Sequence, residues 1–141
     1  MLAGAELPFF KGEEGHSDGD VLAHAVCDAL LGASALGDIG ELFPPSDPSY
    51  KNADSMELLR GVFARIKKAG WKVINLDCVV ICEKPKVLPF RDVICKSLAE
   101  TLELPLDCVF VKGKTAEKLG ETGKGRAVEA YALCLLESAG I

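Results

Sequence analysis

The sequence is poor in the residues from which metal or redox centres are usually built. It has only two histidines, His16 and His24, and none of its six cysteines form a Cys-x-x-Cys pair. The cysteines stand singly in apolar segments, which is typical of free buried thiols in a reducing compartment. Thiolate zinc motifs are therefore lacking, and imidazole chemistry would have to begin between His16 and His24.

Long apolar runs and blocks of like charge are also missing. The formal net charge is −5, and no run of like charge reaches five residues, which argues against a nucleic-acid or anionic membrane partner. No apolar run approaches the roughly 20 residues that span a bilayer. The first residues lack the charged and apolar regions of a secretory signal. We expect a cytoplasmic protein, or one of a plastid-type organelle if a targeting segment has been removed.

A chain of 141 residues fits one domain, here residues 1–141. Apolar periodicity and the placement of Gly and Pro predict helices alternating with strands. This order indicates an α/β fold in which a thin sheet packs against helices. The expected elements are helices at 18–36, 54–70, 91–102 and 126–138, strands at 71–83 and 107–112, and irregular loops at 37–48 and 113–125.

Carboxylates surround His24 at helical spacing. Asp20, His24 and Asp28 are four residues apart, so they would share one face of an otherwise apolar helix. One interpretation is a metal site. The other is a capped helix whose histidine is hydrogen-bonded or solvated, because a single histidine with helically spaced carboxylates is a weak metal signal.

A second group of polar residues follows the predicted strand at 107–112. Residues 112–118 supply ammonium groups, the Thr115 hydroxyl and the Glu117 carboxylate within seven residues. Such a turn suits a diphosphate, and Glu117 could hold a divalent ion that bridges the phosphates. A solvated basic turn without a ligand is the alternative.

Five blocks in this order and spacing resemble the family of 2-C-methyl-D-erythritol 2,4-cyclodiphosphate synthases. The blocks are Ser17-Asp-Gly-Asp-Val-x-x-His24-Ala-x-x-Asp28, Ala35-Leu-Gly-Asp-Ile-Gly40-x-Leu-Phe-Pro44, Asp54-Ser, Pro85-Lys-x-Leu-Pro89 and Thr115-x-Glu-Lys-Leu-Gly120-x-Thr-Gly. The resemblance implies a homotrimer with active sites between adjacent subunits. It also implies a metal-dependent phosphorus–oxygen lyase that converts 4-diphosphocytidyl-2-C-methyl-D-erythritol 2-phosphate to the 2,4-cyclodiphosphate and releases CMP, in non-mevalonate isoprenoid biosynthesis.

The resemblance also assigns roles to residues. By resemblance, His24 is a zinc ligand, Glu117 binds Mg²⁺ or Mn²⁺ with the diphosphate, and His16 and Thr115 act in catalysis. The implied substrate contacts are His16 and Ser17 over the diphosphate; Asp38, Ile39 and Gly40 at the cytidine ribose; Phe43, Pro44, Pro45, Ser46 and Asp47 at the erythritol; Cys82, Glu83, Lys84, Pro85, Lys86, Val87 and Leu88 at the cytosine; Lys114, Thr115, Ala116 and Glu117 at the phosphates; and Lys124 near the trimer axis.

The chain departs from the family pattern at several positions. The family opens with a strand ending in Asp-x-His, which supplies the other two protein ligands of the zinc, whereas Met1 stands where the second strand begins. We therefore expect an N-terminally truncated chain with an incomplete Zn²⁺ site and poor turnover. Pro45 replaces an acidic residue of the family, and Glu121 and Lys124 replace an aromatic residue and an arginine.

Two other functions remain open. The first is a non-catalytic trimer that binds a cytidine nucleotide or an isoprenoid diphosphate. The second, without the resemblance, is a generic metal-dependent phosphoryl-transfer domain. A preference for cytosine over other bases would favour the family pocket over the generic domain.

Overall fold

A computed structural model describes residues 1–7 and 20–140, and its described part contains a three-stranded sheet in the order β2-β1-β3. β1 (Trp71–Ile81) lies in the centre, parallel to β2 (Val109–Lys114) and antiparallel to β3 (Glu129–Ser138). Asp77 is paired with Phe110 on one side and with Leu133 on the other. Since β1 and β2 are parallel, the chain leaves both strands at the same end of the sheet.

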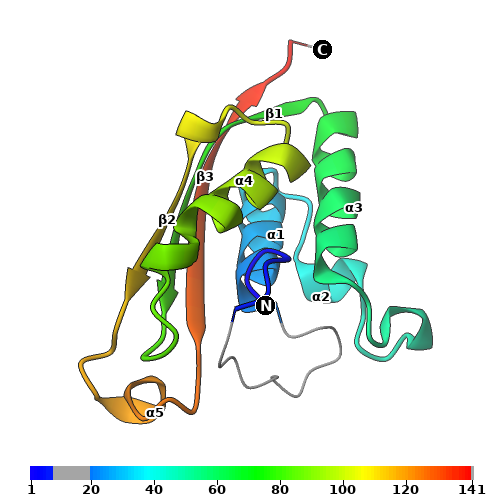
Figure 1. The fold of residues 1–141 in the computed structure, drawn as a ribbon. Coiled ribbons are helices and arrows are strands. Elements are labelled where there is room, and N and C mark those ends of the chain that lie inside the picture. The colour runs from blue at the N-terminus through cyan, green and yellow to red at the C-terminus, as the bar shows by residue number, and fades with distance from the viewer. Residues whose placement is uncertain (8–19, 141) are drawn as a thin grey trace.

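Helices cover one face of this sheet (Figure 1). α1 (Val21–Ala33) contacts β3, α4 (Arg91–Thr101) contacts β2, and α3 (Ser55–Lys68) packs mainly on α1. Alternate residues of β1, among them Leu76, Cys78 and Val80, point into the core between the sheet and the helices. The predicted α/β fold with a small sheet packed against helices is therefore confirmed.

Shorter elements complete the described part of the chain. α2 (Ile39–Leu42) and α5 (Gly120–Gly123) are four-residue helices. Three 3₁₀ turns lie at Pro48–Tyr50, Leu88–Phe90 and Leu106–Cys108. No helix within these residues is long and apolar enough to cross a membrane.

The expected C-terminal helix at 126–138 is wrong, because this segment forms β3. Its residues alternate between a partly buried face, with Ala132 and Cys134, and an exposed face, with Tyr131 and Leu133. This period of two matches a strand beside β1, and the pairing overrides the helical propensity of Ala and Leu. The loop expected at 37–48 is also partly wrong, because it contains α2.

Candidate functional site

The polar residues near α1 form the first group, called here the helix-end cluster: Asp20, His24, Asp28 and Asp38. Asp20 is fully buried and is the N-cap of α1 rather than a residue of its exposed face. Its Oδ1 accepts from the N–H groups of Ala3 and Ala23 at 2.9 and 3.0 Å, and its Oδ2 accepts from Gly4 at 2.8 Å. The Asp20 carboxylate thus joins the turn at residues 2–5 to the start of α1.

His24 lies one turn further along α1 and is half-buried. Its Nε2 is 2.9 Å from the Ser55 hydroxyl, at the first residue of α3. The contact joins two helices far apart in the sequence. It agrees with the simpler of the two interpretations of this stretch, a histidine hydrogen-bonded within a capped helix.

The other two carboxylates of the cluster organise α2. Asp28 Oδ1 accepts from the Ile39 N–H at 2.8 Å, and Asp38 Oδ1 accepts from the Glu41 N–H at 2.8 Å. Glu41 in turn accepts from the Asp38 N–H at 3.2 Å, which completes a capping box. These interactions place Asp38 and Gly40 at an exposed corner beside α1.

The described donors around His24 do not by themselves form a three-ligand zinc site. Within residues 1–7 and 20–140, no three His, Cys, Asp or Glu side chains are close enough together to hold a metal ion. Asp20 and Asp28 are engaged with backbone amides. We therefore derive no chemical step through zinc, and His24 as a zinc ligand stays a prediction. His16 and Ser17 lie outside the described residues.

The second group is a cavity where β1 and β2 end, called here the strand-end pocket. It has a volume of about 190 Å³ and is lined by Cys82, Lys86, Val87, Leu88, Arg91, Gly113, Lys114 and Thr115. The structure thus brings together residues from two predicted segments, 82–88 and 114–117. Of the first segment, Cys82, Lys86, Val87 and Leu88 line the cavity, whereas Glu83, Lys84 and Pro85 do not.

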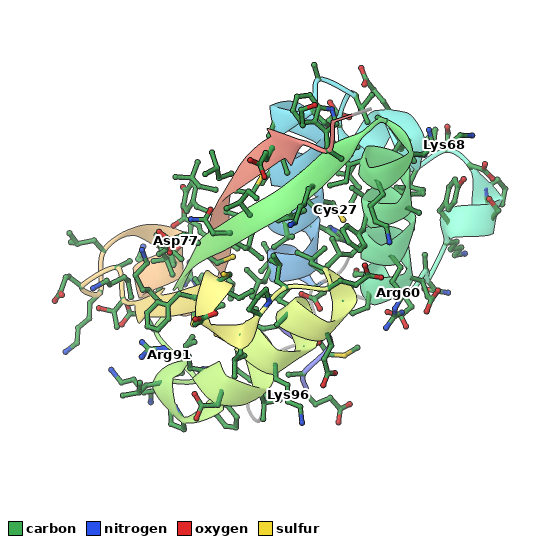
Figure 2. The ribbon with its side chains drawn as sticks, turned by 90° about the horizontal axis from the view of Figure 1, so that it is seen from above. Cys27, Arg60, Lys68, Asp77, Arg91 and Lys96 are labelled. Carbon is green, nitrogen blue, oxygen red and sulfur yellow. The ribbon has the colours of Figure 1, made fainter. Side chains whose placement is uncertain are left out.

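Close packing shapes one wall of the strand-end pocket. A Cβ atom at Gly113 would lie 2.7 Å from the Cβ of Val87, so only glycine fits there. Arg91 closes another side: its Nε donates to the Val111 carbonyl at 2.8 Å, and its guanidinium lies over the Phe110 ring, 4.7 Å from the centroid. Figure 2 shows Arg91 at one end of α4, away from the interior position of Cys27.

The lining of the strand-end pocket is cationic. Lys86, Arg91 and Lys114 line it, and none of the described lining residues is acidic. Burial raises the pKa of the Cys82 thiol, Glu83 adds to the rise, and Lys86 opposes it. Cys82 is therefore a neutral thiol at neutral pH and is a poor nucleophile. The charge and size of the cavity suit an anionic ligand or part of one.

A tight turn at residues 115–118 continues from β2 at the mouth of the strand-end pocket. Thr115 lines the cavity and its Oγ1 accepts from the Glu117 N–H at 3.3 Å. Glu117 and Lys118 have left-handed backbone conformations, with φ of +52° and +63°. The exposed Glu117 carboxylate makes no hydrogen bond or ion pair with the described residues, so it is available to a ligand.

The helix-end cluster and the strand-end pocket lie apart in one chain. Figure 1 shows α2 and the end of β2 on opposite sides of α1.

The predicted erythritol contacts lie near the helix-end cluster, directly after α2. Phe43 stacks edge-on against Tyr50 at 5.1 Å, Pro44, Pro45 and Ser46 follow in a turn, and Asp47 accepts from the Ser49 N–H at 2.9 Å.

Lys124 is not part of either group. It is exposed next to α5, where its Nζ lies 3.9 Å from Glu121, which is also 3.5 Å from Arg126.

The sequence did not predict two residues of the strand-end pocket, Arg91 and Gly113. A glycine inside a strand pattern is a signal of close approach and could have indicated Gly113. Arg91 carries no comparable signal, because only the tertiary fold brings it to β2.

Comparisons with known proteins agree with this fold. A model of the YgbB family matches residues 1–137. The 2-C-methyl-D-erythritol 2,4-cyclodiphosphate synthase of Treponema denticola is 56% identical over 136 residues, covering 96% of this chain and 84% of that protein. The protein of the same name from Azoarcus sp. is 47% identical, covering 99% of this chain and 86% of that protein.

Solved structures are similar in the same way. A structure of 2C-methyl-D-erythritol-2,4-cyclodiphosphate synthase in its CDP-bound form is 36% identical, with a TM-score of 0.88, over 97% of this chain and 89% of that chain. The bifunctional IspDF of Campylobacter jejuni is 40% identical, with a TM-score of 0.94, over 98% of this chain but only 37% of that longer chain. The chain therefore belongs to the YgbB family, whose members among these relatives are 2-C-methyl-D-erythritol 2,4-cyclodiphosphate synthases.

Proposed function

We propose that this protein converts 4-diphosphocytidyl-2-C-methyl-D-erythritol 2-phosphate to 2-C-methyl-D-erythritol 2,4-cyclodiphosphate and releases CMP. The observation that carries the proposal is the strand-end pocket, a cationic cavity that opens beside the Thr115 hydroxyl and the exposed Glu117 carboxylate. The reaction brings one phosphate against another, so catalysis consists of positioning and charge neutralisation. It needs no protein nucleophile, which agrees with the neutral Cys82 thiol.

Each part of the second group has a task in this reaction. The cavity lined by Cys82, Val87 and Leu88 and by the end of β2 takes the cytosine, and Lys114 and Lys86 neutralise the phosphates that follow it. Thr115 donates a hydrogen bond to a phosphate oxygen whose charge grows in the transition state. A relative in this family, IspF of Plasmodium falciparum, has been solved as a CDP complex, at 37% identity and a TM-score of 0.78.

A divalent ion is proposed beside Glu117. The donor is a hard carboxylate oxygen without a partner in the described chain, and Mg²⁺ or Mn²⁺ commonly takes one such oxygen together with substrate phosphates and water. The ion would neutralise charge on the diphosphate as the two phosphates approach. Glu117 and the substrate would hold it.

The complete site is proposed to form between adjacent subunits of a homotrimer. Asp38, Ile39 and Gly40 would meet the ribose, with 43–47 at the erythritol, yet they lie across α1 from the strand-end pocket of the same chain. Edge strand β3 also exposes Tyr131, Leu133 and Leu135 at 58%, 75% and 57%. Exposed apolar rows of this kind mark surfaces that other chains cover, so β3 is a candidate contact between copies.

Isothermal calorimetry with CMP, UMP and AMP tests the pocket. CMP should bind about tenfold more tightly than the other two, because a site that hydrogen-bonds one base rejects bases that cannot form the same bonds. Equal affinities would refute the cytosine assignment. A second titration, of CDP with Mg²⁺ and then with EDTA, should show weaker binding without the ion.

Release of CMP from the substrate tests the reaction itself. Thr115→Ala should lower the rate of CMP release about 100-fold relative to the unmodified chain, by loss of a hydrogen bond in the transition state. Thr101→Ala is a matched control, because Thr101 only donates to the Ser97 carbonyl within α4. Cytosine preference without any CMP release would instead support the non-catalytic nucleotide-binding trimer.

A further inference from the structure

We infer that Glu83 is a positioning residue, whose carboxylate holds the turn at residues 115–118 in the shape needed to engage the ligand's phosphates and their divalent ion. The inference rests on the proposed function, and it gives Glu83 a different task from the base contact that the family resemblance implies. Glu83 follows β1 directly, while the turn follows β2, so a long-range contact is involved.

Within residues 1–7 and 20–140, the hydrogen bonds of Glu83 all go to the backbone of this turn. Its Oε1 accepts from the Ala116 N–H at 2.8 Å and lies 3.5 Å from the Lys118 N–H. The intervening amide of Glu117 is bonded to Thr115 Oγ1 at 3.3 Å. All three consecutive amides of the turn therefore point at side-chain oxygens, two of them at one carboxylate oxygen.

The backbone of the turn needs such support. Glu117 and Lys118 carry side chains in the left-handed region, at φ of +52° and +63°, where L-residues other than glycine are disfavoured. Two adjacent residues of this kind persist only where surrounding contacts determine them. The charge-assisted hydrogen bonds to Glu83 hold the backbone in this conformation, since a carboxylate is a stronger acceptor than a neutral group.

Glu83 itself does not line the strand-end pocket. Its neighbour Cys82 does, and so does Lys86, but Glu83 is absent from the cavity wall. The Cys82 N–H also donates to the Lys114 carbonyl at 3.0 Å, which continues the pairing of β1 with β2. Consecutive residues thus have separate tasks: Cys82 faces the cavity, and Glu83 fixes the turn that carries Thr115 and Glu117.

Two substitutions in this chain separate positioning from base contact. Glu83→Ala removes the acceptor, whereas Glu83→Gln keeps a carbonyl oxygen at the same reach. Glu103→Ala is the matched control, because Glu103 is exposed and its one ion-pair partner among the described residues is Lys67. Calorimetry with CMP, which has no β-phosphate, is compared with calorimetry of CDP and Mg²⁺, and amide hydrogen exchange is followed at Ala116 and Lys118.

Glu83→Ala should keep the affinity for CMP within about twofold of that of the unmodified chain, but should weaken the binding of CDP with Mg²⁺ about tenfold. It should also speed amide hydrogen exchange at Ala116 and Lys118. Glu83→Gln should remain within about threefold of the unmodified chain. An equal loss of CMP and CDP affinity in Glu83→Ala would overturn the inference in favour of base contact. Unchanged exchange, or a Gln variant as impaired as Ala, would overturn it as well. If the unmodified chain binds neither nucleotide, the proposed function fails and the inference falls with it.

Discussion

The helix-end cluster and the strand-end pocket use their charged groups in different ways. In the cluster, Asp20, Asp28 and Asp38 all accept hydrogen bonds from backbone amides, so their charges hold the chain together. In the pocket, Lys86 and Lys114 face a cavity that is lined by no acidic residue of the described part of the chain. The carboxylates of the cluster therefore stabilise the fold, whereas the cations at the strand ends are placed to bind the negative charge of a ligand.

The largest expected effect comes from removing the buried cap of the helix-end cluster. Asp20→Ala removes a fully buried carboxylate and leaves the buried amides of Ala3 and Ala23, and the partly buried amide of Gly4, without their acceptor. We expect a loss of about 3 to 5 kcal/mol in the free energy of unfolding, because unsatisfied buried donors cost about 1 to 3 kcal/mol each. Urea denaturation followed by circular dichroism measures it.

Asp54→Ala is the control for this comparison. Asp54 is the exposed N-cap of α3 and accepts from a single amide, that of Met56, at 2.9 Å. Its removal should cost about 1 kcal/mol. If the two variants lost equal stability, Asp20 would be an ordinary cap rather than the tie between residues 2–5 and α1.

A smaller effect is expected at the wall of the strand-end pocket. Gly113→Ala forces its Cβ against the Cβ of Val87, now only 2.7 Å from that position, which should cost about 1 to 3 kcal/mol and weaken CMP binding. Adding Val87→Ala should restore part of both losses, with a favourable coupling of about 1 kcal/mol in the double-mutant cycle. Thermal denaturation and CMP calorimetry measure these changes.

Gly32→Ala is the matched glycine control in α1. A Cβ there meets nothing within 4 Å, and alanine favours a helix, so the variant should be neutral or up to about 1 kcal/mol more stable. A loss at Gly32 similar to that at Gly113 would contradict the steric argument. Absence of coupling between Gly113 and Val87 would show that the wall tolerates the extra atom by shifting elsewhere.

The two regions also differ in how far the sequence predicts them. Apolar periodicity correctly predicted α1, α3 and β1, because their buried faces repeat regularly along the chain. It missed α2, although Asp38 and Glu41 have capping-box spacing. It assigned β3 to a helix, because propensity within the segment does not reveal the neighbouring strand β1.

The candidate site residues of the two regions also differ in how far the sequence predicts their roles. The role of Asp20 as a cap was open to prediction, since it directly precedes α1, whereas Asp28 lies inside α1 and accepts from Ile39, eleven residues further along the chain. Arg91 and Gly113 were missed, because their meeting with Phe110 and Val87 depends on the docking of α4 and the segment after β1. Local patterns therefore predict the self-contained cluster better than the pocket, which is assembled from distant segments.

The smallest effect is a pH dependence that separates the two regions through their thiols. Burial, followed by the charges of Asp28 and Asp20, raises the pKa of Cys27 from 9.0 to about 12. The pKa of Cys82 is raised too, but Lys86 opposes the rise. Because the unfolded thiol ionises first, the stabilising contribution of Cys27 is complete below pH 9 and is lost as the pH rises from 9 toward 12.

At pH 9.5 this loss amounts to about 0.8 kcal/mol for Cys27, from the fraction of unfolded thiol that has ionised. The decline in unfolding free energy between pH 8 and 9.5 should therefore be smaller by about that amount in Cys27→Ala, which no longer carries the thiol. Cys82→Ala should reduce the decline less, because burial raises the pKa of the Cys82 thiol less than that of Cys27, and Lys86 opposes part of the rise that Glu83 adds. If both variants flattened the pH profile equally, the two thiols would not differ in their burial and surrounding charges as described.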